Sequence, residues 1–181
     1  TRKLFKVCAL RHIPIFTFIN KMDRETRDPL DLCEEVEREL GIDTYAVNWP
    51  IGCGKEFQGV YDREKQRILF FQAEERGKKV SSAEVALDDP QLEELIGEKK
   101  AAALREEVEL LGGGREFDME AVRNGSLSPV FFGSALTTFG VEPFLEEFLR
   151  MTTAPLPRVS DKGEVDVFSE DFSAFVFKIQ A

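Results

Sequence analysis

The sequence predicts an α/β fold with a doubly wound sheet, and three observations support this prediction. The apolar residues 13–19 form a strand pattern that ends at Asn20-Lys21-Met22-Asp23. A second apolar strand pattern, residues 129–132, ends at Gly133-Ser134-Ala135-Leu136. Each motif is followed by an amphipathic helical pattern, as expected where helices cover a parallel sheet.

Both motifs have residue types that suit recognition of guanine. A carboxylate such as Asp23 at the end of a buried strand can accept hydrogen bonds from the ring N–H and the exocyclic amine of guanine, a donor pair that adenine lacks. The small residues of the second motif let backbone amides approach the guanine carbonyl oxygen. Ligands of open α/β sheets bind at the carboxyl ends of the strands. The alternative for each motif is ordinary turn chemistry, because Asn, Asp, Gly and Ser favour turns.

Helices are predicted on both sides of these strands. Residues 1–10 have apolar positions at helical spacing. Asp28 and Pro29 form an N-cap and a first-turn proline for a second helix, and Gly41 stands where a C-cap glycine belongs. A third helix follows Gly140, with an apolar stripe made of Val141, Phe144, Leu145, Phe148 and Leu149.

The distance between the motifs indicates an insertion, because 114 positions separate Asn20 from Ser134. Between them the pattern changes to short strands and then helices, which predicts a compact α+β subdomain. The strands are expected at residues 45–50, 57–61 and 67–71, and the helices at 97–111 and 117–123. We therefore expect a nucleotide-reading domain made of residues 1–43 and 126–160, an inserted subdomain at 44–125, and a linker with a further strand at 161–181.

Composition excludes several classes of function. The chain has 181 residues, of which 43% are hydrophobic, and no apolar run reaches the roughly 20 residues of a membrane span. A net charge of −10 argues against direct DNA or RNA binding. The single His12 and the scattered Cys8, Cys33 and Cys53 form no metal-site or redox pattern, so we predict no metal ligands, no catalytic residues and reduced thiols in a cytoplasmic protein.

Three segments resemble the translational GTPases. They are residues 18–24, residues 48–61, which begin Asn-Trp-Pro-Ile-Gly-Cys-Gly-Lys, and residues 131–136. Within that family the pattern is most similar to the bacterial class II peptide chain release factors of the release factor three type, over essentially the whole chain. The resemblance implies a partial P-loop-type GTPase domain, and it implies that residues 172–181 begin a following β-barrel domain. We therefore expect the chain to be an internal piece of a longer protein.

The resemblance also implies a role for each site residue. Asp23 would hold the guanine edge, Asn20 would brace the loop and contact the base, and the stem of Lys21 would lie on the ring. Ser134, Ala135 and Leu136 would close the pocket, with the Ala135 N–H donating to the guanine oxygen. The cofactor would be GTP or GDP, with Mg²⁺ held by residues outside this chain. The phosphate loop and the switch segments of the family are absent from residues 1–181, so this piece is expected to be inactive in hydrolysis.

For the longer protein the resemblance implies a GTPase that acts on the ribosome and promotes recycling of class I release factors in translation termination. The glutamate-rich helices of the insert could contact the ribosomal stalk protein, or they could be ordinary solvated faces. Two alternatives remain open. One is an elongation factor G-like translocase or a ribosomal protection GTPase, and the other is a non-catalytic protein-interaction module.

Overall fold

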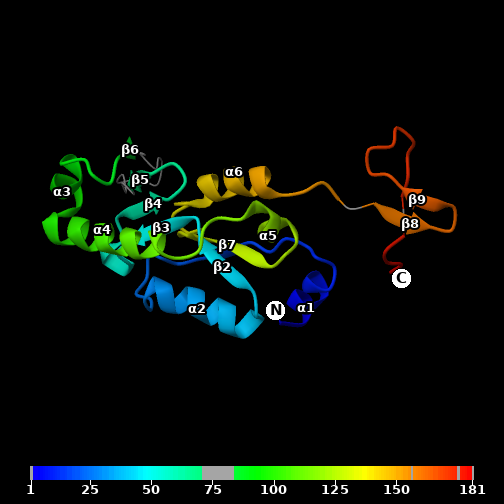
Figure 1. Cartoon of the computed structure of the whole chain (residues 1–181), viewed down its shortest axis with the longest axis horizontal. Coiled ribbons are helices and arrows are strands. Elements are labelled where there is room, and N and C mark those ends of the chain that lie inside the picture. Colours follow the sequence, from blue (N-terminus) through cyan, green and yellow to red (C-terminus); the bar gives the residue numbers. More distant parts are fainter. Residues whose placement is uncertain (1, 71–83, 156, 175, 181) are drawn as a thin grey trace. The chain divides into compact units, whose positions relative to one another are not determined.

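The computed structural model describes residues 2–70, 84–155, 157–174 and 176–180. The chain divides into two units, Thr1–Met151 and Thr152–Ala181. The larger unit contains two sheets, and the smaller one contains a hairpin (Figure 1).

The first sheet of the larger unit is parallel and has three strands in the order β1-β7-β2. These are β1 (Thr17–Ile19), β7 (Leu127–Phe132) and β2 (Asp43–Ala46). The central strand β7 is buried along its whole length. β1 covers only the last three residues of the predicted strand 13–19, and residues 13–16 take no strand conformation. The adjacency of β1 and β7, which lie more than a hundred residues apart in the chain, confirms that the two motif strands are neighbours.

Helices lie on both faces of this sheet, as the predicted doubly wound arrangement requires. Figure 1 shows α2 (Pro29–Leu40) and α6 (Val141–Met151) on opposite sides of β7 and β2. Successive residues of a strand point to opposite faces of the sheet, so neighbouring residues of β7 face different helices. Val130 and Phe132 join the hydrophobic cluster that includes Cys33 of α2, whereas Phe131 joins the cluster that includes Met151 of α6.

The caps of α2 form as predicted. The Asp28 carboxylate accepts from the Leu30 N–H at 2.8 Å, and Pro29 occupies the first turn. Gly41 adopts the left-handed conformation, and its N–H donates to the Glu37 carbonyl. The N-terminal helix α1 (Arg2–Ala9) also forms, but none of its described residues is buried.

The second sheet is antiparallel, with four strands in the order β3-β4-β5-β6. These are β3 (Asn48–Ile51), β4 (Gly59–Asp62), β5 (Arg67–Phe70) and β6 (Glu84–Val85). A short 3₁₀ helix, η1 (Gly54–Glu56), connects β3 to β4. The predicted strand 67–71 therefore forms, although residue 71 lies outside the described residues.

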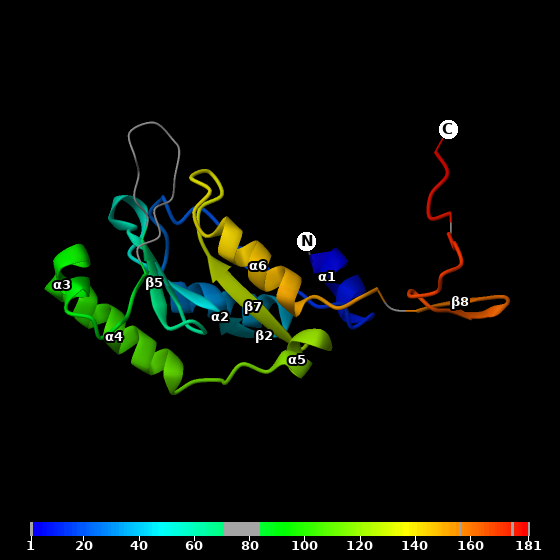
Figure 2. The ribbon, with the colours of Figure 1, turned by 90° about the horizontal axis from the view of Figure 1, so that it is seen from above.

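Three helices accompany this sheet: α3 (Gln91–Ile96), α4 (Glu98–Gly112) and α5 (Met119–Arg123). Leu92 and Ile96 of α3 and Leu104 of α4 are buried in the same cluster as Trp49 of β3. Figure 2 shows α4 running along the side of the antiparallel strands. The strands and helices predicted between the motifs thus form an α+β arrangement.

One predicted strand, residues 45–50, is wrong as a single element. The structure divides it at Val47, whose N–H donates to the Val130 carbonyl of the parallel sheet and whose carbonyl accepts from Arg63 of the antiparallel region. Residues 43–46 consequently belong to the parallel sheet as β2. The first part of the nucleotide-reading domain was expected to end at residue 43, so this strand extends past that expected end. The change of sheet could not be predicted from the apolar pattern, because the apolar residues on both sides of Val47 are buried.

The predicted stripe of α6 is partly wrong. Phe144 contacts the rings of Phe18 and Phe131, with ring centroids 5.3 and 5.1 Å apart, as expected for a core position. Leu145 and Leu149, however, are 50% and 74% exposed. Glu147, which the pattern assigns to the solvent side, is only 6% exposed and accepts from Arg150 at 2.6 Å, with Lys65 3.4 Å away. Paired cations thus compensate the buried carboxylate.

The smaller unit contains an antiparallel hairpin of β8 (Arg158–Ser160) and β9 (Gly163–Val165). The strand predicted at residues 172–179 is wrong for the residues that the structure describes, because they take no strand conformation there. Phe172 and Phe177 are 96% and 87% exposed. A strand needs a neighbouring strand to accept and donate its backbone hydrogen bonds, and within the described segment none pairs with these residues.

Candidate functional site

The first loop of the candidate site follows β1. Asn20 and Lys21 are exposed, Met22 is buried, and Asp23 is half-buried. Lys21 has a φ of 72°, in the left-handed region that non-glycine residues seldom adopt. The Asn20 side-chain oxygen accepts from the Lys21 N–H at 2.7 Å, and this contact supports the turn. The loop therefore has a defined conformation that presents polar side chains at the carboxyl end of β1.

The second loop follows β7 and is built more tightly. Ser134 is fully buried, and its N–H donates to the Phe139 carbonyl at 3.0 Å, which closes a short loop. Gly133 lies in a space that admits no side chain, because an added Cβ would stand 2.6 Å from the Phe139 carbonyl oxygen and 2.8 Å from the Phe18 ring. A glycine is therefore required at the end of β7.

The structure brings the two loops together through their side chains. The Ser134 hydroxyl donates to the Asp23 carboxylate at 2.5 Å. The Asn20 side-chain oxygen accepts from the Ala135 N–H at 2.9 Å. The Met22 N–H donates to the Gly133 carbonyl at 3.1 Å. Five predicted site residues thus lie in or beside one hydrogen-bonded cluster, at the carboxyl ends of two adjacent parallel strands.

Two predicted roles fit this geometry less directly. The Ala135 N–H, expected to donate to a guanine oxygen, donates to Asn20 in the structure. It could reach a guanine oxygen only if it were shared between two acceptors or if the Asn20 amide turned away. Leu136, expected to help close the pocket, is 78% exposed and makes no hydrogen bond among those of the described residues.

The site is an exposed edge of the sheet and not an enclosed cavity. Asn20, Lys21 and Ala135 are exposed, while Asp23 keeps one carboxylate oxygen away from its bond with Ser134. An ionised carboxylate can accept several hydrogen bonds, so Asp23 retains acceptor capacity for a ligand with paired N–H donors. The cluster can therefore select a planar base by its hydrogen-bonding edge.

Sequence patterns gave no indication of the role of Asn48. This side chain is 4% exposed and bonds to the backbone of Phe132 in both directions. Its Nδ2 donates to the Phe132 carbonyl at 3.1 Å, and its Oδ1 accepts from the Phe132 N–H at 2.7 Å. Asn48 thus takes the place of a neighbouring strand at the last residue of β7, one residue before the second loop. The one available signal was its position directly before Trp49, at the start of the segment 48–61 that resembles the translational GTPases.

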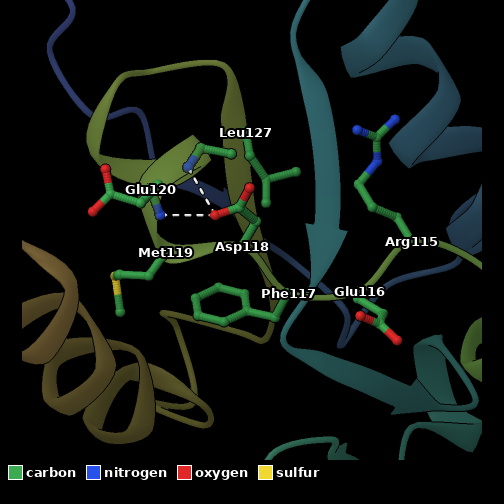
Figure 3. A pocket seen from close by; sticks show the side chains of 8 residues that line it. Arg115, Glu116, Phe117, Asp118, Met119, Glu120 and Leu127 are labelled. Carbon is green, nitrogen blue, oxygen red and sulfur yellow. Dashed lines mark hydrogen bonds between the residues drawn. The ribbon is translucent and has the colours of Figure 1, made fainter.

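One hollow in the described surface lies away from this cluster. It has a volume of about 510 Å³ and is lined by residues around α5 and by Leu127, at the opposite end of β7 (Figure 3). One of its charged groups, the Asp118 carboxylate, already accepts from the N–H groups of Glu120 and Ala121. This carboxylate caps α5, so its position is explained by the helix and not by a ligand.

A second hollow of about 350 Å³ lies against α2, β2 and the end of α4. Burial, with a further contribution from Glu37, raises the pKa of Cys33 to about 11, which keeps this thiol protonated and unreactive. Arg63 stacks over the Tyr45 ring at 4.3 Å and donates to the carbonyls of Ala46 and Leu111. These contacts fasten α4 to the sheet.

The glutamates of the insert are only partly free for a partner. The Glu107 carboxylate accepts from the Trp49 indole N–H at 2.6 Å, and Glu93 pairs with Arg105 at 2.7 Å. Glu106 and Glu109 are exposed.

The described residues contain no cluster of three or more His, Cys, Asp or Glu side chains able to hold a metal ion. Within the same residues, no helix has the length and apolar character to cross a bilayer.

Comparison with known proteins finds relatives that match the whole length of this chain. The chain is 51% identical over 183 residues to peptide chain release factor 3 of Acaryochloris marina (strain MBIC 11017), with all of this chain and 34% of that protein covered. It is 50% identical over 184 residues to peptide chain release factor 3 of Synechocystis sp., again with 100% of this chain and 34% of that protein covered. The chain thus spans about a third of the length of these relatives, and the resemblance read from its motifs is confirmed.

A solved structure from Thermus thermophilus supports the fold alone. Its TM-score is 0.57 at 21% identity, over 85% of this chain and 24% of that chain. The family model described as the elongation factor Tu GTP binding domain matches residues 1–154, which include both loops of the site. This chain therefore belongs to the family of the elongation factor Tu GTP binding domain.

Proposed function

We propose that this chain reads the guanine base of GTP or GDP for a cytoplasmic, ribosome-associated GTPase, which promotes recycling of class I release factors during translation termination. The main support is the cluster in which Ser134 bonds to Asp23 and Ala135 bonds to Asn20. The release factor 3 relatives support the role in termination.

In the proposed complex each residue has a chemical task. Asp23 accepts the ring N–H and the exocyclic amine of guanine, and the Ser134 hydroxyl fixes the carboxylate in the required orientation. Asn20 holds the two loops at a constant separation through the Ala135 N–H. The aliphatic stem of Lys21 covers one face of the base. A ligand without paired donors would leave the Asp23 carboxylate unsatisfied, and this is the physical source of specificity.

Replacing Asp23 by Asn tests this proposal in the complete protein. The amide has no negative charge and places an N–H donor where the carboxylate had its second acceptor oxygen, so we expect GDP affinity to fall about 100-fold, as for the loss of hydrogen bonds to a charged group. The amide N–H can instead donate to the second carbonyl of xanthine, so affinity for xanthosine diphosphate should rise. Asn still offers an oxygen to Ser134, which preserves the contact between the loops. Isothermal titration calorimetry with both nucleotides measures the change.

Asp161→Asn is the matched control, because it makes the same chemical change in the turn between β8 and β9. It should leave both affinities as in the wild type. An Asp23→Asn protein that keeps its preference for GDP would refute guanine reading. The non-catalytic interaction module would then be the better interpretation.

Hydrolysis requires groups that cradle phosphates and hold Mg²⁺, and the proposed base-reading residues supply neither. We therefore propose that Mg²⁺ and the phosphates are bound by other parts of the complete protein. Residues 1–181 alone should release no phosphate from GTP, and a phosphate-release assay that detects turnover would contradict this.

The insert is the proposed contact for the ribosomal stalk protein. Glu106 is the appropriate residue for a test, because it is exposed on α4, whereas Glu107 is bonded to Trp49. Glu106→Lys should reduce stalk-dependent stimulation of GTP hydrolysis without changing GDP affinity. If stimulation were unchanged, the glutamates on this face of α4 would be interpreted as ordinary solvent-exposed residues that contact no partner.

A further inference from the structure

Residues 48–57 of the insert, here called the bracing segment, contact both loops of the site. The segment comprises β3, the turn after it and η1, and it ends at Phe57. The sequence Gly52-Cys53-Gly54-Lys55 within it resembles a phosphate-binding loop only superficially, because Trp49 and Glu56 stand where that motif needs Gly and Ser or Thr. Its role must therefore be sought in its contacts.

On the side of the first loop, the contact is made by one backbone group. The Gly54 N–H donates to the carbonyls of Met22, at 2.9 Å, and Arg24, at 3.1 Å. These two carbonyls lie on either side of Asp23 in the chain. A single amide of the insert thus holds the backbone on both sides of the carboxylate that is proposed to read guanine.

On the side of the second loop, the contacts come from two side chains. Phe57 is buried and meets the Phe139 ring edge to face, with centroids 5.4 Å apart. The Phe139 carbonyl accepts the Ser134 N–H. Asn48 meanwhile pairs with the backbone of Phe132, as described above. The segment therefore supports the residues before and after Ser134.

The bracing segment is itself fastened to the rest of the insert. Lys100 of α4 donates to the Glu56 carboxylate and, at 3.3 Å, to the Gln58 side-chain oxygen. The hydrogen bond and the charge of Lys100 lower the pKa of Glu56. The segment is thus held between α4 and the two loops.

From these contacts we infer that the bracing segment positions Asp23 for guanine specificity, with Gly54 as its principal positioning residue. This inference rests on the proposed function, because it concerns how the same base-reading site is held. Displacing the segment should alter selection among bases, since hydrogen bonds to a base depend on the placement of their acceptor within fractions of an ångström.

The local geometry explains why position 54 is a glycine. Gly54 has a φ of +59°, which L side chains rarely adopt, and an added Cβ would stand 2.3 Å from the Glu25 carboxylate oxygen and 3.2 Å from the Glu25 backbone nitrogen. The side chain of Glu25 can move, but its backbone can yield only with the loop that carries Asp23. A methyl group at position 54 therefore presses on the first loop.

Gly54→Ala in the complete protein tests the inference, with Gly41→Ala as its matched control. Gly41 has a similar φ of +67°, but an added Cβ there meets nothing within 4 Å. Both variants carry the backbone strain, and only Gly54→Ala disturbs the loop. The readout is the ratio of the dissociation constants for inosine diphosphate and GDP, because inosine lacks the exocyclic amine that Asp23 is proposed to accept.

We expect Gly54→Ala to reduce this ratio about five- to tenfold and Gly41→Ala to change it less than about twofold. A loss of stability alone would lower the unfolding temperature of both variants without moving the ratio. Equal ratios for the two folded variants would overturn the inference.

If Gly54→Ala does not fold, a second pair of variants tests whether the bracing segment positions Asp23. Phe57→Leu removes the ring contact with Phe139, whereas Phe117→Leu removes a comparable contact with Tyr45, at 5.2 Å, near α5. The ratio should fall about threefold for Phe57→Leu and stay constant for Phe117→Leu. The same ratio for both would overturn the inference. Failure of the proposed function looks different, because Asp23→Asn would then gain no affinity for xanthosine diphosphate.

Discussion

Ser134 is fully buried after β7, whereas Asn20 and Lys21 are exposed at the corresponding place after β1. The strands differ in the same way. β7 has a hydrogen-bonded neighbour on each side and six buried residues, while β1, with three half-buried residues, pairs among the described strands with β7 only. The loop after β7 is therefore shaped mainly by its own strand and by the short bridge from Ser134 to Phe139, and Asn48 and Phe57 of the insert add contacts at its two ends.

The loop after β1 is held in place by contacts from outside. Ser134 bonds to Asp23, Gly133 accepts the Met22 N–H, and Gly54 of the insert donates to the backbone around Asp23. The carboxylate that we propose reads guanine thus lies on the loop that depends more on contacts from other segments. Damage to the loop after β7 should spread to both loops, whereas damage to the loop after β1 should stay local.

The largest effect is expected from disrupting the loop after β7 at its base. Gly133→Ala would place a methyl group 2.6 Å from the Phe139 carbonyl oxygen and 2.8 Å from the Phe18 ring. Neither group can move without disturbing the sheet, so we expect the free energy of unfolding to fall by about 1–3 kcal/mol. Urea unfolding followed by circular dichroism measures the change.

Gly112→Ala is a control with the opposite expected sign. An added Cβ at Gly112, the last residue of α4, meets nothing within 4 Å, and alanine favours the helix by up to about 1 kcal/mol. If Gly133→Ala were as stable as Gly112→Ala, the tight packing at the end of β7 would not govern the second loop.

A smaller effect is expected from cutting the contact between the loops. Ser134→Ala removes the hydroxyl that donates to Asp23 but leaves the buried backbone bond to Phe139 in place. We expect GDP affinity to fall about fivefold, in line with the net contribution of about 1 kcal/mol for one such hydrogen bond. Titration calorimetry with GDP provides the measurement.

Ser160→Ala is the matched control, because Ser160 makes a comparable hydrogen bond at 2.9 Å, to the Gly163 carbonyl within the β8–β9 hairpin. It should bind GDP as the wild type does. If Ser134→Ala also bound GDP like the wild type, the orientation of Asp23 would not depend on the second loop. The Ser134–Asp23 hydrogen bond would then not couple the two loops.

Local chemistry made several features predictable. Asp28, Pro29 and Gly41 define the ends of α2 because capping and left-handed conformation depend on neighbours within a few residues. The two strand-end motifs were recognisable for the same reason. Features that depend on distant partners were predicted less well. The sheet changes at Val47, Glu147 is buried against Lys65 and Arg150, and residues 172–179 form no strand among those described.

From the sequence alone one can predict that two polar motifs follow two apolar strands, and their residue types lead to the hypothesis of a base-reading site. The sequence also indicated the family, since the motifs are short and contiguous. Three further contacts became visible only in the folded structure: the Ala135 N–H bonds to Asn20, Asn48 pairs with the backbone at the end of β7, and Gly54 bonds to the loop that contains Asp23. These contacts join residues far apart in the chain, and their geometry depends on how the two sheets pack, which no local pattern encodes.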